Sequence, residues 1–383
     1  SCLEFAPTCL KIDGSAIHAW VSSTNGDISL TGQGGDTGDY NVGIVIVDLA
    51  LIESTGTGAN AGTITIDGTG RGVDSSEGVF MAFADIASVD GAIQITGLST
   101  ATGEDNAGIE ISDWAIIGST GTGLNAAMIT LIGTGGGTDN SEGVEIQEGS
   151  EITSVDGAIS ITGNTTATGE DNPGIEISEG AWIVSFGSGL NAATITLDGT
   201  GNGTDGSDGV FIEDTFIESI DGAIRITGRT HATGENNAGI VLDGESDIVS
   251  FGTGALAATI TLFGTGGGTD NCEGIEIQYL SWIASIDGAI TLTGLTTATG
   301  QDNEGIEISE GALIGAFEHP TLPDTGLATI TLTGPAQDLA VVSESCSAMM
   351  VHFIRSKDIP TLPESAATPA VSCSMAAVPS SWA

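Results

Sequence analysis

Basic side chains are almost missing from this chain. Its 383 residues contain 6 Lys and Arg against 51 Asp and Glu, which gives a formal net charge of −45 at pH 7. Such a surface repels the phosphates of nucleic acids and anionic membrane surfaces alike. The sequence therefore argues against nucleic acid as a partner and predicts an extracellular or cell-surface location, where a salt-rich or calcium-rich medium screens the charge.

Aromatic residues, long apolar runs and cysteines are scarce as well. Aromatics make up 4% of the chain, and no run of 18 apolar residues is present, so we expect no membrane-spanning helix. Cysteine does not fix the compartment: Cys2 and Cys9, or Cys346 and Cys373, could pair in an oxidising exterior, but the odd count of five leaves at least one thiol, and only Cys272 interrupts the repeats. Lacking an initiator Met and an apolar leader, the chain is expected to be a mature form or a fragment.

Glycine, in contrast, is abundant and recurs at fixed intervals. There are 59 glycines, and the segment SVDGAI at Ser88 returns at Ser154 and, as SIDGAI, at Ser219 and Ser285. A finer repeat is marked by one glycine before a short apolar pair, with spacings that alternate between 35 and 30 or 31 residues. We call these the marker glycines: Gly43, Gly78, Gly108, Gly143, Gly174, Gly209, Gly239, Gly274 and Gly305.

Each repeat carries three short alternating segments. In Thr194–Leu197 and in Ile175–Ile177 the apolar residues fall on one face and polar residues on the other, as in half-buried strands. A third segment, such as residues 182–185, closes the repeat. One coil cannot bury its isoleucines alone, whereas coils stacked about 4.8 Å apart form a continuous core.

The predicted fold is therefore all-β: a right-handed parallel β-helix, or β-solenoid, of about ten coils with three strands per coil. An antiparallel β-sandwich remains the alternative, since strand patterns alone do not fix pairing partners. We expect residues 1–14 to form an N-terminal cap or a fragment end, 15–334 the solenoid, and 335–383 an irregular C-terminal tail or cap.

An acidic turn precedes each marker glycine. Calcium takes six to eight oxygens from carboxylates, amides and carbonyls, so a stacked row of such turns predicts weak Ca²⁺ sites along one edge. A solvated acidic face without bound metal is the alternative. The predicted ligands are Glu104, Asp105, Asp139, Glu142, Glu170, Asp171, Asp205, Asp208, Asp270, Glu273 and Asp302.

Two other sets of residues suggest different functions. Threonine pairs in alternate coils, such as Thr166 and Thr168, form a ladder of the kind that binds ice, although His231 breaks it. Arg225 and Arg229, close in sequence to Asp221 and His231, are the only basic pair in the repeats and could serve a polysaccharide lyase or hydrolase. Drift on a solvated face is the simpler explanation, so no catalytic residue is assigned.

The repeat style resembles that of large bacterial surface proteins of planctomycetes and cyanobacteria, related to filamentous haemagglutinin-type β-helices. The resemblance covers about residues 15–334 and lies in the ITITGTGG-like strands, the GI or GV followed by an acid, and the GAxIxS segment of Gly180, Ala181, Ile183 and Ser185. It implies a stalk or adhesive shaft and no catalytic residues.

Together these features predict a secreted structural or adhesive rod, stabilised by calcium, and not an enzyme. Its expected partners are cell-surface or matrix components, with polysaccharide among them, and copies of itself joined end to end. A polysaccharide-active β-helix enzyme and an ice-binding or other ligand-binding solenoid remain the alternatives.

Overall fold

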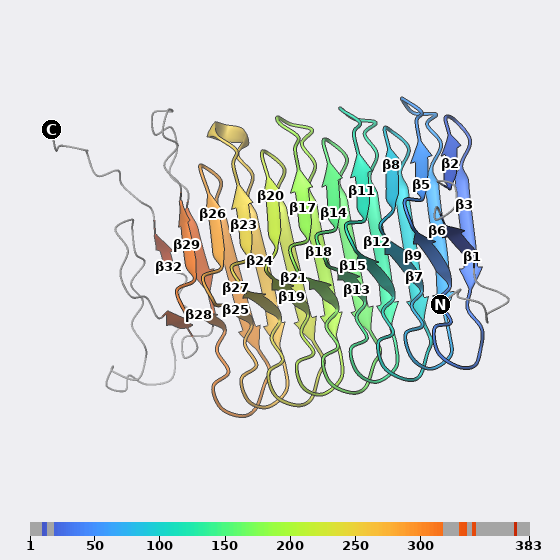
Figure 1. The fold of residues 1–383 in the computed structure, drawn as a ribbon. Helices are drawn as coiled ribbons and strands as arrows, with labels where there is room; N and C mark the ends of the chain where they lie inside the picture. Colours follow the sequence, from blue (N-terminus) through green and yellow to red (C-terminus); the bar gives the residue numbers. More distant parts are fainter. Residues whose placement is uncertain (1–9, 14–18, 317–328, 335–338, 342–370, 374–383) are drawn as a thin grey trace, which may run out of the picture.

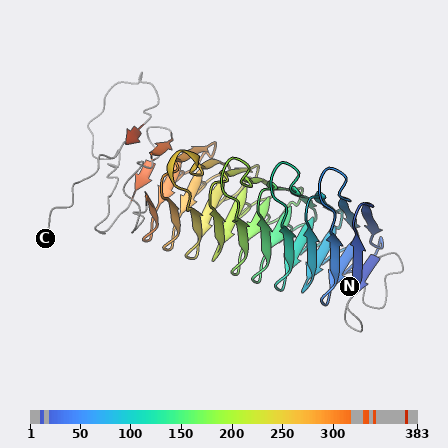
Figure 2. The same cartoon turned by 90° about the horizontal axis from the view of Figure 1, so that it is seen from above.

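The chain forms a β-solenoid in which every coil contributes one strand to each of three sheets. A computed structural model describes residues 10–13, 19–316, 329–334, 339–341 and 371–373. Figure 1 shows the coils stacked side by side along a rod, and Figure 2 shows the same stack from above. The predicted parallel β-helix with three strands per coil is confirmed.

The strands are short, and those of sheet C are the longest. Sheet A holds β1 (Leu10–Asp13), β4 (Ile44–Val47), β7 (Val79–Ala82), β10 (Ile109–Ser112), β13 (Val144–Ile146), β16 (Ile175–Ile177), β19 (Val210–Glu213), β22 (Ile240–Asp243), β25 (Ile275–Ile277), β28 (Ile306–Ile308) and β31 (Leu339–Val341). Sheet B holds β2 (Trp20–Ser23), β5 (Leu51–Ser54), β8 (Asp85–Ser88), β11 (Ile116–Ser119), β14 (Glu151–Ser154), β17 (Trp182–Ser185), β20 (Phe216–Ser219), β23 (Asp247–Ser250), β26 (Trp282–Ser285) and β29 (Leu313–Ala316). Sheet C holds β3 (Ile28–Gln33), β6 (Ile64–Gly70), β9 (Ile93–Ser99), β12 (Ile129–Gly135), β15 (Ile159–Thr165), β18 (Ile195–Gly201), β21 (Ile224–Thr230), β24 (Ile260–Gly266), β27 (Ile290–Thr296), β30 (Ile330–Thr333) and β32 (Val371–Cys373). A 3₁₀ turn, η1 (Gly254–Leu256), lies in one loop.

Strand pairing follows the repeat. Ile175 of β16 lies opposite Val144 of β13 and Val210 of β19, so like residues stack on like residues. Strand pairs are parallel throughout the three sheets apart from the antiparallel pair of β30 and β32. This pattern rules out the antiparallel sandwich. β1 lies before residue 15, and β31 and β32 lie after residue 334; much of the two predicted end segments falls outside the described residues.

The core is a stack of aliphatic side chains enclosed by the three sheets. Ile109, Ile117 and Ile129 represent one coil, and each is fully buried. Burying such a side chain stabilises the fold by about 1.5–3 kcal/mol. The alternation seen in the sequence thus places the isoleucines inside and the acids and hydroxyls outside.

Hydrogen-bonded polar ladders fill the corners of this core. Where sheet C turns into sheet A, asparagine and serine alternate from coil to coil: the Ser141 N–H donates to Asn172 Oδ1 at 2.9 Å, and the Asn172 N–H donates to Ser207 Oγ at 3.2 Å. Where sheet B ends, serines such as Ser154 and Ser219 donate to glycine carbonyls. The Asn and Ser ladder therefore joins neighbouring coils, whereas Ser154 and Ser219 bond within their own coil.

Alternation in repeat length arises at the loops between sheets B and C. The connection over residues 55–63 is longer than that over 89–92, and this difference recurs in every second coil. The aspartate of SVDGAI caps the longer loop of the preceding coil: Asp156 Oδ2 accepts from the Gly123 N–H at 2.6 Å. Asp90, Asp221 and Asp287 do the same for Gly58, Gly189 and Gly254.

The marker glycines are needed because sheets A and C approach each other closely. A Cβ on Gly163 of β15 would lie 2.0 Å from the carbonyl oxygen of the marker Gly174. A side chain at either position would collide with backbone, so the glycine periodicity is a packing requirement.

Candidate functional site

Carboxylates gather on the outer face of sheet A, which we call the acidic face. It comprises the outward side chain of each sheet A strand and the residue directly before each marker glycine. The outward row, in register from coil to coil, is Val45, Phe80, Glu110, Glu145, Glu176, Phe211, Val241, Glu276 and Glu307. The second row is Val42, Glu77, Ala107, Glu142, Pro173, Asp208, Ala238, Glu273 and Glu304.

Several of these carboxylates are buried from water. Glu77, Glu142 and Asp208 are 7%, 6% and 6% exposed. Loss of hydration, reinforced by the neighbouring carboxylate of Glu176, raises the pKa of Glu142 well above its usual range. The same two causes, with Glu142 as the nearest charge, raise the pKa of Glu145.

The raised pKa values extend along the face. Burial, followed by the charge on Glu77, raises the pKa of Glu110 to about 8. Burial also raises the pKa of Glu176 to about 7 and that of Glu273 to about 8. In a poorly hydrated row of carboxyl groups, the charge of each ionised group raises the pKa of its neighbours. The acidic face therefore retains protons near neutral pH unless a cation lies against it.

One end of the acidic face is hollowed into a groove of about 690 Å³. Val45, Phe80, Glu110 and Glu145 form its floor. The turns before the marker glycines form one rim, and the turns after the sheet A strands form the other. The remaining lining residues are Tyr40, Val42, Val47, Asp48, Ser75, Glu77, Ala82, Phe83, Asp105, Ala107, Asp113, Asn140, Glu142 and Gln147. The groove thus combines an apolar end with an acidic end.

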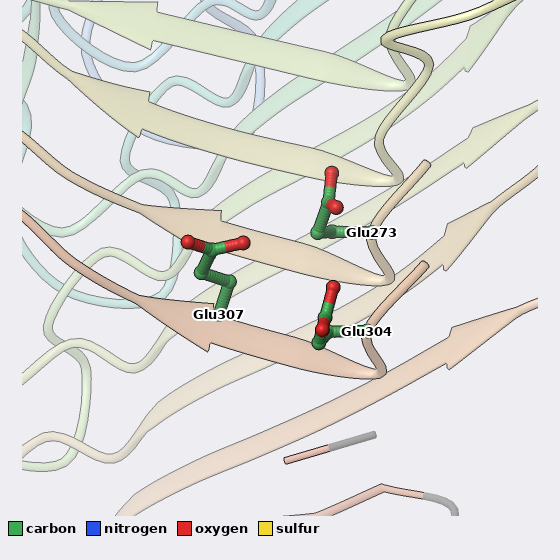
Figure 3. A group of neighbouring side chains, drawn as sticks. All are labelled: Glu273, Glu304 and Glu307. Carbon is green, nitrogen blue, oxygen red and sulfur yellow. The ribbon is translucent and has the colours of Figure 1, made fainter. Parts of the chain in front are cut away.

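Near the other end of the face, three glutamates converge (Figure 3). Glu273, Glu304 and Glu307 each offer one oxygen, and these oxygens lie within 4.8 Å of one another. Glu304 stands where the equivalent coils have Ala107, Pro173 and Ala238, so among the described repeats only this coil of its kind has a carboxylate directly before its marker glycine. The arrangement could supply part of the oxygen shell of a divalent cation.

The sequence-predicted calcium ligands separate into three groups in the structure. Asp139, Asp205 and Asp270 are used within the turns, where their carboxylates accept the backbone N–H of Glu170, Glu235 and Gln301 in the next coil. Glu104, Glu170 and the left-handed Asp105, Asp171 and Asp302 lie in the turns before the marker glycines, and of these five only Asp105 lines the groove. Glu142, Asp208 and Glu273 lie buried on the acidic face.

Among the eleven predicted ligands, the structure brings only Glu273 into a group of three potential ligands, together with two residues that the prediction did not include. Glu304 directly precedes the marker Gly305, and Glu307 is the central residue of β28. A comparison of the residues that precede every second marker glycine could have singled out Glu304, because the equivalent residues are Ala107, Pro173 and Ala238.

The threonine pairs stabilise the stack. Thr166 Oγ1 donates to the carbonyl oxygen of Gly135 at 3.0 Å, and Thr100 and Thr297 donate to Gly70 and Gly266 in the same way. The hydroxyls therefore tie one coil to the coil before it.

Arg229 and Asp221, two of the residues considered for a polysaccharide-active site, have separate partners in the structure. Arg229 pairs with Asp198 of the neighbouring strand at 3.1 Å, on the outer face of sheet C. Asp221 caps the Gly189 loop. Arg229 and Asp221 are thus each engaged in contacts between coils.

Within the described residues, no helix is both long enough and apolar enough to span a membrane. Comparison with known proteins finds no matching family model, no matching curated protein and no matching solved structure.

Proposed function

We propose that the chain is a rigid structural or adhesive rod of the cell exterior, and that divalent cations, calcium above all, stabilise it by binding along the acidic face. The observation that carries this proposal is the in-register row of carboxylates on sheet A. Neighbouring strands lie about 4.8 Å apart, a distance at which two unit charges repel by about 1 kcal/mol even in bulk water.

The distribution of charge supports a role for external cations. The ion pairs of Arg71 with Asp36 and of Arg229 with Asp198 involve residues of sheet C and the turns beside it, and neither arginine reaches the acidic face. From Val42 to Glu307 neither row of that face contains a basic residue, and Lys11 of β1 stands in register with Val45 at its end. Calcium, a hard cation with a preference for carboxylate oxygens, would relieve this repulsion. The resemblance to bacterial surface stalks agrees with a mechanical role.

The test is a thermal melt followed by circular dichroism in calcium, magnesium and sodium at matched ionic strength. We expect calcium to raise the melting temperature more than magnesium or sodium, because binding to the folded state alone adds stability by linkage. Glu304→Ala, which restores the residue found in equivalent coils, should reduce the calcium-specific part of the rise.

Glu151→Ala is the matched control, because Glu151 points outward from sheet B. It should leave the calcium effect unchanged. Equal melting temperatures in the three salts would overturn the calcium part of the proposal and leave an acidic rod that binds no calcium.

A polysaccharide-active enzyme is the second candidate. The groove favours it, since paired carboxylates of unequal pKa can act as acid and base on a glycosidic bond. Release of new reducing ends from a panel of neutral polysaccharides, abolished by Glu110→Gln, would support this function over that of a passive rod.

A further inference from the structure

The groove departs from the repeat pattern in its aromatic residues. Three residues before a marker glycine, most coils have Asp, Asn, Ser or Gly, but the first has Tyr40. Five residues after the glycine, most have Asp or Glu, but the second coil has Phe83. Both residues adopt left-handed backbone angles, with φ of 59° and 48°, which aromatic residues rarely do. Strain of this kind is retained where a side chain serves a purpose on the surface.

These aromatics frame an apolar wall. Tyr40 and Phe83 are 56% and 47% exposed on opposite rims, and Phe80 lies on the floor between them. Val42 and Val45 complete this end. Exposed aromatic rings brought together from separate coils offer π faces to a ligand.

The opposite end of the groove is lined by carboxyl groups. Glu77 and Glu142 are more than nine-tenths buried, yet both line the groove beside Glu110 and Glu145. No basic side chain occurs among the described residues that line it. A buried carboxylate is costly without a cationic partner, so the positive charge of a ligand would stabilise the ionised forms of Glu142 and Glu145.

We propose that this groove is a binding site for a small organic ammonium ion, with its apolar body against Tyr40, Phe80 and Phe83 and its cationic nitrogen against Glu142 and Glu145. The volume is that of a site for a small molecule. Aromatic faces attract ammonium groups by cation–π interactions, and the carboxylates add charge complementarity. A bare metal ion would gain nothing from the apolar wall, and an anionic sugar would be repelled. The site shares Glu142 and Glu145 with the acidic face along which calcium binding is proposed, so the two kinds of cation would compete for these carboxylates.

Binding of a cation must also displace protons. Burial and neighbouring carboxylates raise the pKa values of Glu142 and Glu145 well above their usual range, and an ammonium ion favours the ionised form of both groups. The described groups whose charges act on these two carboxyls are acidic: Glu110, Glu176, Glu77 and Asp105. Affinity should therefore rise with pH over the range in which these carboxyls ionise.

The test is isothermal titration calorimetry of the full chain with benzyltrimethylammonium, and with benzyl alcohol as the neutral comparator. We expect the cation to bind at least tenfold more tightly than the alcohol, a ratio of the size that a desolvated cation–π contact produces. Titrations in buffers of different ionisation enthalpy should show proton release at pH 7.5. Weak binding of both ligands, equal binding of both, or binding without proton release would overturn the proposal.

Two variants locate the site. Phe83→Asn removes an aromatic wall and places at this left-handed position a residue that tolerates it, so the fold should be at least as stable while affinity falls about tenfold. Tyr279→Asn is the matched control: Tyr279 has the same place in its coil, five residues after Gly274, and a φ of 45°, but lies outside the groove. A loss of affinity in Tyr279→Asn, or none in Phe83→Asn, would overturn the assignment. Glu142→Gln with Glu145→Gln should abolish proton release.

Discussion

Cys272 stands where three other coils have a serine of the corner ladder. Ser76, Ser141 and Ser207 each donate to a backbone carbonyl two residues earlier, at 3.0, 3.0 and 3.2 Å. The buried thiol of Cys272 takes the same position, 3.2 Å from the carbonyl oxygen of Asp270. A thiol is a weaker donor and acceptor than a hydroxyl.

Cys272→Ser should therefore leave the free energy of unfolding unchanged or raise it, because the serine restores the consensus ladder. Cys272→Ala should lower it by about 1 kcal/mol, since the hydrogen bond is lost. Chemical denaturation of the wild type and both variants under reducing conditions measures these differences. If the alanine variant were as stable as the wild type, the hydrogen bond of the Cys272 thiol would contribute nothing to stability.

At the scale of the structural elements, the polar ladder joins coils that share no local sequence contact. Asn172 makes three hydrogen bonds to the two flanking coils: it accepts from the Ser141 N–H, its N–H donates to Ser207, and its Nδ2 donates to the Thr138 carbonyl at 2.8 Å. Because Asn172 is fully buried, water cannot replace these bonds.

Asn172→Ala is expected to lower the free energy of unfolding by about 2–4 kcal/mol, because it leaves a buried N–H and a buried carbonyl without a partner. Asn191→Ala, at an exposed loop position, should change it by less than about 0.5 kcal/mol. Urea denaturation followed by circular dichroism gives both values. Equal losses in the two variants would show that the ladder adds no stability of its own.

The strands and their register could be predicted because the marker glycines and the isoleucines that follow them recur at fixed intervals. Ile175 and Ile177 point inward and Glu176 outward, as their alternation indicates. The ladder was missed because Asn172 and Ser141 have the composition of a turn. The groove was missed because Tyr40, Phe80 and Phe83 come from two coils and become neighbours only when these stack. The burial of Glu142 follows from rims that flank it on both sides, which the sequence does not reveal.

At the scale of the whole molecule, the acidic face makes stability depend on pH. Burial first, and neighbouring carboxylates second, raise the pKa values of Glu110 and Glu273 to about 8 and that of Glu276 to about 7. In the unfolded chain such groups titrate near 4.5. Between these values the folded state binds more protons than the unfolded state, so stability falls as the pH rises.

The melting temperature should therefore be highest near pH 5 and fall steadily up to about pH 8 in buffer without divalent cations. Asp27, whose pKa is lowered by the backbone N–H of Thr63, works in the opposite direction, but it is a single exposed group. Thermal melts at constant ionic strength measure the slope, and Glu142→Gln with Glu145→Gln should flatten it by removing two of the groups that must ionise. A melting temperature that is constant or rises between pH 5 and pH 8 would mean that the carboxylates of the acidic face are hydrated in the folded state, contrary to their burial on sheet A.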